Sequence, residues 1–278
     1  MKARVFLVAA AFAVGAVPAA AQTSSSDWTY SLQPYVWLPG LKANLNYGPP
    51  PAGGNSPNVT MDTGKLLEAV DMAAMMTGEA RKGRWSAGFD AMYLDLGHFD
   101  SRVASVDFNP GSGPVNVSTA NLNAGGATDM SGTLLTLNGG YAVIDGKRNV
   151  MDVIAGLRYF RMHAHTDWTL AAAVAGPGGS AAFARTGAAD KSDDVWVGIV
   201  GVKGRMMLGA SDWYVNYYAD IGSGSSARTW QASGGIGYVF KWGDAVLDYR
   251  TLHYNIGGQN LIDQLTLSGL SIGARFRF

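Results

Sequence analysis

The chain ends in the stretch Leu265-Thr-Leu-Ser-Gly-Leu-Ser-Ile-Gly-Ala-Arg-Phe-Arg-Phe278. Counting back from Phe278, every second residue is apolar as far as Leu270, and the residues between them are Arg277, Arg275 and small polar or glycine positions. Successive side chains of a β-strand point to opposite faces, so this alternation predicts a strand with one apolar and one polar face over residues 265–278. A strand of this kind separates two different environments.

The other end of the chain has the pattern of a secretory signal. Lys2 and Arg4 form a basic start, residues 5–17 an apolar core, and residues 19–21 a small-residue cleavage site. We therefore expect a signal peptide over residues 1–21, cleaved near Ala21, and one mature domain over residues 22–278. The sequence has no cysteine, so processing as a lipoprotein is excluded.

Composition excludes several classes of function. Lys+Arg and Asp+Glu number 21 each, and the leader holds two of the bases, so the mature chain is slightly acidic and does not favour nucleic acid as a partner. Without cysteine there is no disulfide and no thiolate metal site. After the leader, no apolar run approaches the ~20 residues of a transmembrane helix. The 37 glycines, 12 tyrosines and 8 tryptophans are typical of membrane barrels with aromatic belts.

Period-two patterns and turn signals predict nine strands before the final one, and a short helix over residues 63–70. The predicted strands cover residues 28–45, 72–81, 85–101, 131–143, 149–168, 193–206, 213–221, 228–240, 245–255 and 265–278. Within 85–101, Leu94 and Leu96 break the alternation, which predicts a bulge. The phase of 193–206 is ambiguous. Because two strands are weakly marked, eight or twelve strands remain alternatives to ten.

The connections between these strands alternate in length. Short turns follow every second strand, and the long connections 46–70, 102–129 and 170–192 fall on the other end. Together with the exported leader, this predicts an all-β fold, a single antiparallel up-and-down transmembrane β-barrel. The expected location is the outer membrane of a Gram-negative bacterium, with both chain ends in the periplasm.

Several segments resemble a group of small, mostly uncharacterised outer-membrane barrel proteins of Gram-negative bacteria. They are residues 33–40, 79–85, 93–96, 247–254 and 270–278. The resemblance covers most of the mature chain and implies the barrel, its location, and contact with outer-membrane lipid and lipopolysaccharide. It also implies that Phe276 and Phe278 form the C-terminal signal read by the barrel-assembly machinery. It brings no substrate and no catalytic residue.

Six charged residues fall on the predicted inner faces of strands: Asp90, Asp152, Arg158, Asp220, Asp248 and Arg250. A barrel of about ten strands has a narrow lumen that side chains largely fill. Because an unpaired buried charge is costly, these residues are expected to form an ion-pair network that braces or closes the barrel. The alternative is a selectivity ring for small solutes or ions.

Histidines give weaker signals. The His163-x-His165-x-Asp167 pattern places three ligand types on one strand face, but such short matches are unspecific. Ten-stranded barrels of the omptin type use Asp–Asp and His–Asp pairs at the outer rim, for which Asp95, Asp100, His98, His163, His165 and His253 are candidates on paper. Lipid-modifying barrels need a Ser–His pair, with His98 or His253 as candidates, but no serine context supports one.

The sequence therefore predicts a narrow passive pore or a structural barrel. The alternatives are a surface ligand-binding or adhesion barrel that uses its long loops, and, with less support, an outer-membrane hydrolase. We expect no catalytic, metal or cofactor site and no cofactor.

Overall fold

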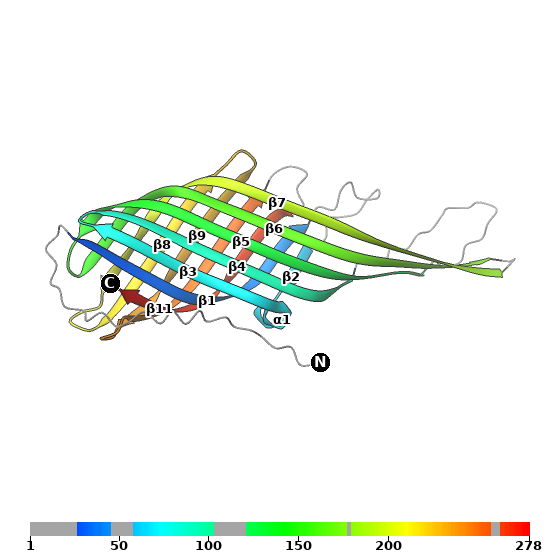
Figure 1. Ribbon diagram of the computed structural model, residues 1–278, viewed down its shortest axis with the longest axis horizontal. Helices are drawn as coiled ribbons and strands as arrows, with labels where there is room; N and C mark the ends of the chain where they lie inside the picture. The colour runs from blue at the N-terminus through cyan, green and yellow to red at the C-terminus, as the bar shows by residue number, and fades with distance from the viewer. Residues whose placement is uncertain (1–26, 46–57, 103–120, 177–178, 257–261) are drawn as a thin grey trace.

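The computed structural model describes residues 27–45, 58–102, 121–176, 179–256 and 262–278, so the expected signal peptide lies outside the described residues. Eleven strands and one helix follow in chain order (Figure 1). They are β1 (Trp28–Leu45), β2 (Asn58–Met61), α1 (Thr63–Ala69), β3 (Val70–Lys82), β4 (Trp85–Arg102), β5 (Asn121–Asp145), β6 (Asn149–Gly176), β7 (Gly179–Met207), β8 (Trp213–Ser223), β9 (Ala227–Val239), β10 (Asp244–Ile256) and β11 (Ile262–Arg277).

Strands β3 to β11 pair antiparallel in sequence order, and β1 pairs with both β3 and β11. This closes a ten-stranded up-and-down barrel and confirms the predicted fold; β2 is a short addition to the edge of β1. The last residue takes part in the closure. The N–H of Tyr30 donates to the carbonyl of Phe278 at 3.1 Å, and the N–H of Phe278 donates to the carbonyl of Tyr30 at 2.9 Å.

The two ends of the barrel differ. One end, which we call the turn end, carries the short connections of residues 83–84, 146–148, 208–212 and 240–243, together with Phe278. Gly83 and Gly209 adopt positive φ angles of 55° and 57° there, a conformation that glycine reaches without strain. At the opposite, loop end, β6 and β7 run on together well beyond the wall (Figure 1).

Two predicted loops are wrong in part. Within 102–129, residues 121–129 belong to β5, and within 170–192 all residues except 177–178 belong to β6 or β7. These segments are rich in small residues and lack alternation, yet the β6–β7 register runs unbroken from Asn149↔Met206 to Gly176↔Gly179. Backbone pairing between two strands needs no period-two pattern of side chains, so alternation could not reveal it. The helix over 63–70 is confirmed as α1, whereas β2 was not predicted.

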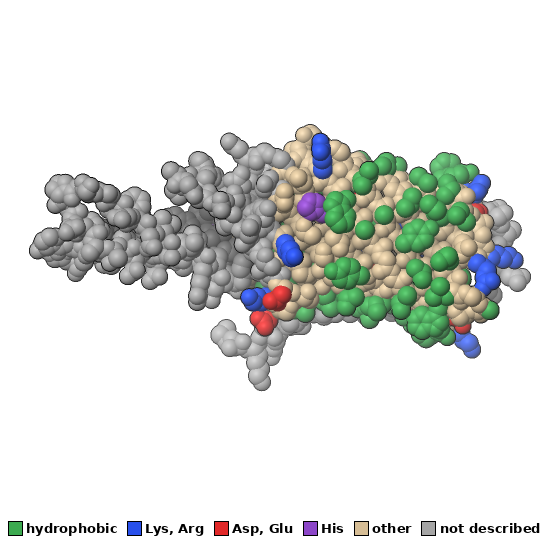
Figure 2. Space-filling view, turned by 180° about the vertical axis from the view of Figure 1, so that it is seen from behind, with side chains coloured by type: hydrophobic (Ala, Val, Ile, Leu, Met, Phe, Trp, Pro, Cys, Tyr) green, Lys and Arg blue, Asp and Glu red, His purple; other side chains and the backbone are tan. Residues whose placement is uncertain are grey.

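The outer wall is an apolar belt. Aromatic and aliphatic side chains on the outward faces are about half exposed, and on the face shown in Figure 2 charged side chains gather toward the two ends of this belt. Ring pairs mark its edges, with Trp85–Tyr141 and Trp213–Tyr238 toward the turn end and Tyr159–Trp196 toward the loop end. A large exposed apolar surface is unfavourable in water and needs a covering medium.

The height of the belt follows from strand geometry. Trp230 on β9 and Phe240 just after its end are exposed outward residues ten positions apart, and so are Trp196 and Met206 on β7. At about 3.3 Å per residue and a tilt of about 40°, ten residues rise about 25 Å along the barrel axis. This is the height of the apolar band of outer-membrane barrels. Among the described residues, no helix has both the length and the apolar character needed to cross a membrane.

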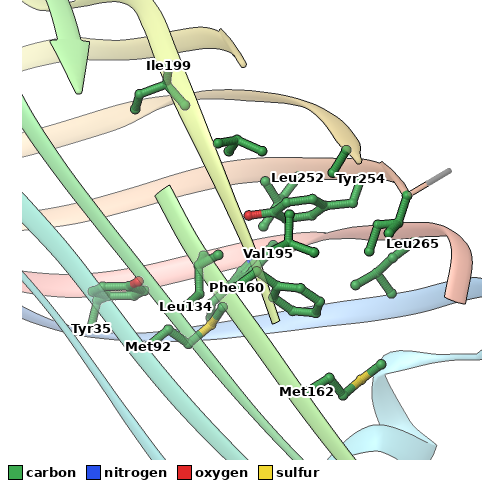
Figure 3. Packing of buried hydrophobic residues seen from close by; sticks show 14 residues of the cluster. Tyr35, Met92, Leu134, Phe160, Met162, Val195, Ile199, Leu252, Tyr254 and Leu265 are labelled. Atoms are coloured by element: carbon green, nitrogen blue, oxygen red, sulfur yellow. The ribbon is translucent and has the colours of Figure 1, made fainter. Parts of the chain in front are cut away.

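The hydrophobic core fills part of the lumen, nearer the loop end (Figure 3). Its buried members come from eight strands and include Trp37, Met92, Leu134, Phe160 and Tyr254. This corrects the expectation of a polar interior throughout. The bulge predicted within 85–101 is confirmed as a register shift between Leu96 and Phe99. The phase break expected at Leu94 and Leu96 is wrong, because even positions of β4 such as Met92 and Leu96 continue to face inward and become apolar. On β7, Val195, Val197 and Ile199 take the inward phase that the sequence left ambiguous.

Candidate functional site

The six charged residues predicted for the inner face all lie on barrel strands and interact across the lumen. Asp90 comes from β4, Asp152 and Arg158 from β6, Asp220 from β8, and Asp248 and Arg250 from β10. Arg158 pairs with Asp220 across the intervening β7, and Arg250 pairs with Asp90 from the other side of the barrel. Their contacts therefore cross the interior instead of following the wall.

Arg158 and Asp220 form the most enclosed of these pairs. Both side chains are 0% exposed, and the guanidinium meets the carboxylate with two parallel hydrogen bonds, of which Nη1 to Oδ1 measures 3.0 Å. The remaining donors of Arg158 go to hydroxyl groups: Nε donates to Thr136 at 3.1 Å and Nη1 also reaches Thr229 at 3.3 Å. A buried pair is tolerated only with such complete hydrogen bonding.

Arg250 forms a second centre. Its Nη2 lies 2.8 Å from Oδ2 of Asp90 and donates to Gln231 at 3.0 Å, while Nη1 donates to the hydroxyl of Tyr35 at 3.0 Å. Tyr35 in turn donates to Oδ1 of Asp90 at 2.6 Å. The guanidinium also lies over the ring of Trp37, 4.8 Å from its centre, which joins the charged layer to the apolar one.

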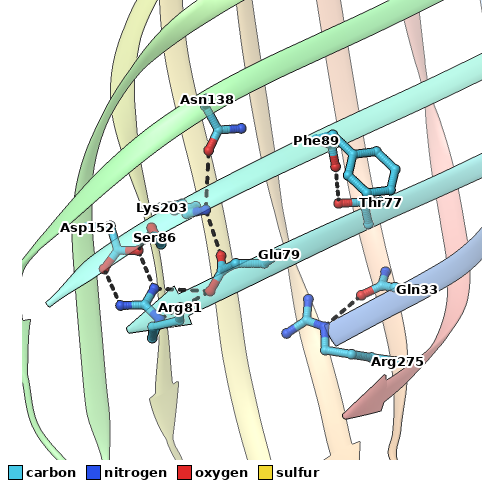
Figure 4. A network of polar contacts seen from close by, with 10 residues as sticks. All are labelled: Gln33, Thr77, Glu79, Arg81, Ser86, Phe89, Asn138, Asp152, Lys203 and Arg275. Carbon is cyan, nitrogen blue, oxygen red and sulfur yellow. Dashed lines mark hydrogen bonds and ion pairs between the residues drawn. The ribbon is translucent and has the colours of Figure 1, made fainter. Parts of the chain in front are cut away.

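A third network lies nearer the turn end (Figure 4). Asp152 accepts from both guanidinium nitrogens of Arg81, one bond measuring 3.2 Å, and from the hydroxyl of Ser86 at 3.1 Å. Arg81 also bonds Glu79, which lies 2.6 Å from Nζ of Lys203. Glu79, Arg81 and Lys203 were not predicted from the sequence as inward-facing charges. They lie on the two strands with the weakest alternation. The only signal in the sequence is that each of them lies an even number of residues from an inward-facing position of the same strand.

Further polar side chains line the turn-end part of the lumen. Asn216 donates to Asp248 at 2.6 Å, so the last of the six predicted residues bonds an amide instead of a cation. The hydroxyl of Tyr214 donates to Asp244 at 3.1 Å, and Asp244 also pairs with Arg277.

The inward side chains are arranged in rows across neighbouring strands. In one row Met75, Met92, Leu134, Phe160 and Val195 stand opposite one another in register from β3 to β7. We call these five residues the apolar row.

The next inward row, two residues nearer the turn end, contains Thr77, Asp90, Thr136 and Arg158. The lumen therefore changes from apolar to charged within one step of the strand.

Both layers close the axis of the barrel. Arg158 and Tyr254 are 0% exposed, and Leu134 is 2% exposed, although all three point into the lumen. These side chains are almost completely buried, so at this level the interior is filled by side chains. The arrangement can brace the barrel and exclude solutes from the axis in this state.

The histidine candidates with described side chains lie on two strands, β6 and β10. On β10, His253 lies 2.8 Å from the hydroxyl of Thr266 and stacks on Trp230 of the outer wall. His163 and His165 lie on β6, and the side chains of His98, Asp100 and Asp167 lie outside the described set. No group of three His, Asp or Glu side chains suited to a metal occurs in the described ranges.

Phe276 and Phe278 both lie on the outer face at the turn end and are exposed. Phe276 contacts Trp242, their ring centres being 5.7 Å apart, so it belongs to the aromatic edge of the belt.

No protein-family model and no curated protein match the sequence. Solved structures to which the chain is similar include Ail, the attachment invasion locus protein of Yersinia pestis, with 8% identity, a TM-score of 0.33, and coverage of 91% of this chain and 99% of that one. The translocator domain of the autotransporter NalP from Neisseria meningitidis matches with 16% identity, a TM-score of 0.41, and coverage of 92% and 90%. The CymD monoaromatic hydrocarbon channel matches with 9% identity, a TM-score of 0.28, and coverage of 91% and 89%.

Proposed function

We propose that this protein is an outer-membrane β-barrel with a closed axis, which serves the cell envelope as a structural barrel instead of an open pore. The location is supported by the apolar belt of about 25 Å and its aromatic edges, which suit a bilayer. The sequence adds a leader over residues 1–21 with a cleavage site near Ala21. The turn end would then face the periplasm and the loop end the outside.

One observation carries the closed axis: the Arg158–Asp220 pair is completely enclosed in the middle of the barrel. In a water-filled passage, charged side chains keep part of their hydration and are exposed to solvent. Here the pair is dry, and the apolar row covers it on the loop side. The proposal includes no catalytic chemistry, no cofactor and no nucleic acid. Its partners are outer-membrane lipid and lipopolysaccharide, and the barrel-assembly machinery during biogenesis.

The test is conductance in planar bilayers, with insertion checked separately. Refolded protein in vesicles of brominated lipid should show strong quenching of tryptophan fluorescence, because most described tryptophans lie on the outer wall. The same preparation should give no discrete current steps, whereas a general porin added to the same bilayer should give them. Steps from the inserted protein would overturn the closed axis and favour the narrow passive pore. Absence of quenching would overturn the membrane location itself.

A second function, surface ligand binding, is favoured by the extension of β6 and β7. Residues 179–194 of β7 lie on the loop side of the core residues Val195 and Val197, and among the described strands they pair with β6 alone. Such a projection extends the surface that an outside partner can reach. Trp168 and Gly187 are paired in register, so removing residues 169–186 between them shortens the hairpin and leaves the β6–β7 pairing from Trp168↔Gly187 to Asn149↔Met206 in place, while residues 121–125 of β5 lose their partner on β6. If the shortened protein folds but cells lose attachment to their surface or ligand, binding is supported; unchanged attachment would contradict it.

A further inference from the structure

The wall of the barrel has an interruption between β1 and β3. The two strands pair from Trp28↔Lys82 to Pro34↔Met76, and β2 pairs with β1 only from Leu41 onward. Among the described residues, 35–40 of β1 therefore have no strand partner on this side, although they pair fully with β11 on the other. Within the same described ranges, residues 70–75 of β3 pair with β4 alone. We call this interruption the seam.

The sequence gives a physical reason for the seam. Tyr30 of β1 exchanges backbone hydrogen bonds with β11. The backbone N–H and C=O groups of the even residues of β1 therefore point toward β11, and those of the odd residues point toward the seam. Of the odd residues, Trp37 donates its N–H to the sulfur of Met75 at 3.2 Å, and Pro39 has no N–H to donate. Thioether sulfur is a weak acceptor. The seam is therefore held by much weaker contacts than the rest of the wall.

Helix α1 lies at the seam, just where β3 begins (Figure 1). It contacts both β1 and β4 and is seated by Leu66, which is 2% exposed. Asp62 caps its first turn by accepting from the N–H of Lys65 at 2.9 Å. With seven residues the helix is too short to be stable alone, so its position depends on this packing. Helix α1 is therefore the element at the seam that is most easily displaced.

The seam opens toward apolar surroundings on both sides. Ten residues separate the two edges of the belt, and Tyr30 is an exposed aromatic at the turn-end edge, so residues 35–40 fall in the loop-end half of the belt. On the inside, the first residue of the apolar row is Met75, which packs against the core cluster. From Met75 the row leads across four further strands to Val195. A continuous apolar track thus begins at a weak point of the wall.

We propose that the seam admits a single alkyl chain from the outer leaflet into the lumen, along the apolar row. This rests on the proposed location in a membrane. The chain is the occupant that fits both sides of the seam: it is slender, apolar and abundant in the surrounding medium. Methionines at two of the five positions give this track adaptable walls. The charged row beneath it, with Asp90 and Arg158, sets the depth, because an alkyl chain cannot satisfy those groups.

The absence of cysteine from the sequence makes accessibility measurable with single substitutions. Leu134→Cys places a thiol in the apolar row, 2% exposed, and Leu137→Cys places one on the lipid-facing side of the same strand, 47% exposed. Each variant is refolded into bilayers and treated with N-dodecylmaleimide, or with a charged, water-soluble methanethiosulfonate. A folded barrel is verified for each by its heat-dependent electrophoretic shift.

We expect N-dodecylmaleimide to label both variants, Leu137→Cys faster, and the charged reagent to label neither at a comparable rate. Adding Leu66→Ala, which loosens α1, should raise alkyl labelling of Leu134→Cys at least about tenfold and leave Leu137→Cys unchanged; tenfold corresponds to ~1.4 kcal/mol of lost packing. If only Leu137→Cys is labelled, or if Leu66→Ala has no effect, the proposed entry of an alkyl chain through the seam is overturned. Fast reaction of Leu137→Cys with the charged reagent would instead contradict the membrane location.

The source of the chain is distinguished in the same assay. If palmitate added to the bilayer slows labelling of Leu134→Cys, a free fatty acid is the preferred occupant. If palmitate does not slow the labelling of Leu134→Cys and the labelling still occurs, the occupant is the acyl chain of a bilayer lipid.

Discussion

Replacing Asp220 by asparagine tests whether the centre of the barrel is dry. Asparagine keeps the shape of the side chain and removes its charge, so Arg158 remains as a cation with no anionic partner. Both side chains of the pair are 0% exposed, and therefore the charge cannot recover its hydration without disrupting the packing. Breaking a buried pair on one side typically costs about 3–5 kcal/mol.

The alternative, a hydrated lumen, predicts a much smaller value. In contact with water, the same pair would contribute only about 0–1 kcal/mol. The two expectations are separated by more than the usual error of an unfolding measurement. Urea titration of the protein in lipid vesicles, followed by tryptophan fluorescence, gives the free energy of unfolding for each variant.

The double variant Arg158→Met with Asp220→Leu is the matched control, because it removes both charges and fills a similar volume. We expect it to lose much less stability than either Asp220→Asn or Arg158→Met alone, since no buried charge is left uncompensated. A loss below about 1 kcal/mol in both single variants would refute the reasoning. Such a result would mean that water reaches the pair, and it would also refute the proposed closed axis.

Three further predictions concern the wall. Val200→Arg, in the middle of the belt, should cost about 2–4 kcal/mol in lipid, and Met206→Arg at its edge about 0–1 kcal/mol, both measured by urea unfolding; equal costs would contradict the bilayer position. Gly156→Ala should be strongly destabilising because its Cβ would overlap a carbonyl of β5, whereas Gly198→Ala, with its closest neighbour at 3.9 Å, should change the unfolding midpoint little. Removal of Phe278 should reduce the heat-modifiable, folded form in cells while refolding in vitro is less affected; equal loss in both would indicate that only barrel closure is involved.

The architecture was accessible from the sequence because two solvents act on each strand. The final strand shows this most clearly: residues 270, 272, 274, 276 and 278 were assigned outward, and the large ones among them are exposed. Period-two alternation identifies such faces without knowledge of the strand's neighbours. The strand count of ten followed from the same signal together with the turn residues.

Period-two alternation does not reveal whether the inner face of a strand meets polar or apolar surroundings. Met92 and Leu96 are apolar and face the lumen, so an apolar inner layer looked like a break in phase. Pairing across the lumen was equally hidden. The partner of Asp152 is Arg81, which lies on a weakly alternating strand three strands away in the barrel, and sequence spacing says nothing about that distance.

The seam leads to a last prediction, in which two prolines of β1 act as test and control. An alkyl chain gains little by moving from lipid to the apolar row, since both are apolar, so its entry is governed by what holds the wall together. The backbone nitrogen of Pro39 points toward the seam, so this proline removes a donor there. Pro34 is an even residue within the part of β1 that pairs with β3, and its backbone nitrogen points toward β11. Pro39→Val adds one N–H at the seam, and a hydrogen bond from it to an acceptor on β3 or α1, worth about 0.5–1.5 kcal/mol net, should slow alkyl labelling of Leu134→Cys about two- to tenfold. Pro34→Val should leave that rate unchanged; an equal effect of both substitutions would show that the chain enters elsewhere.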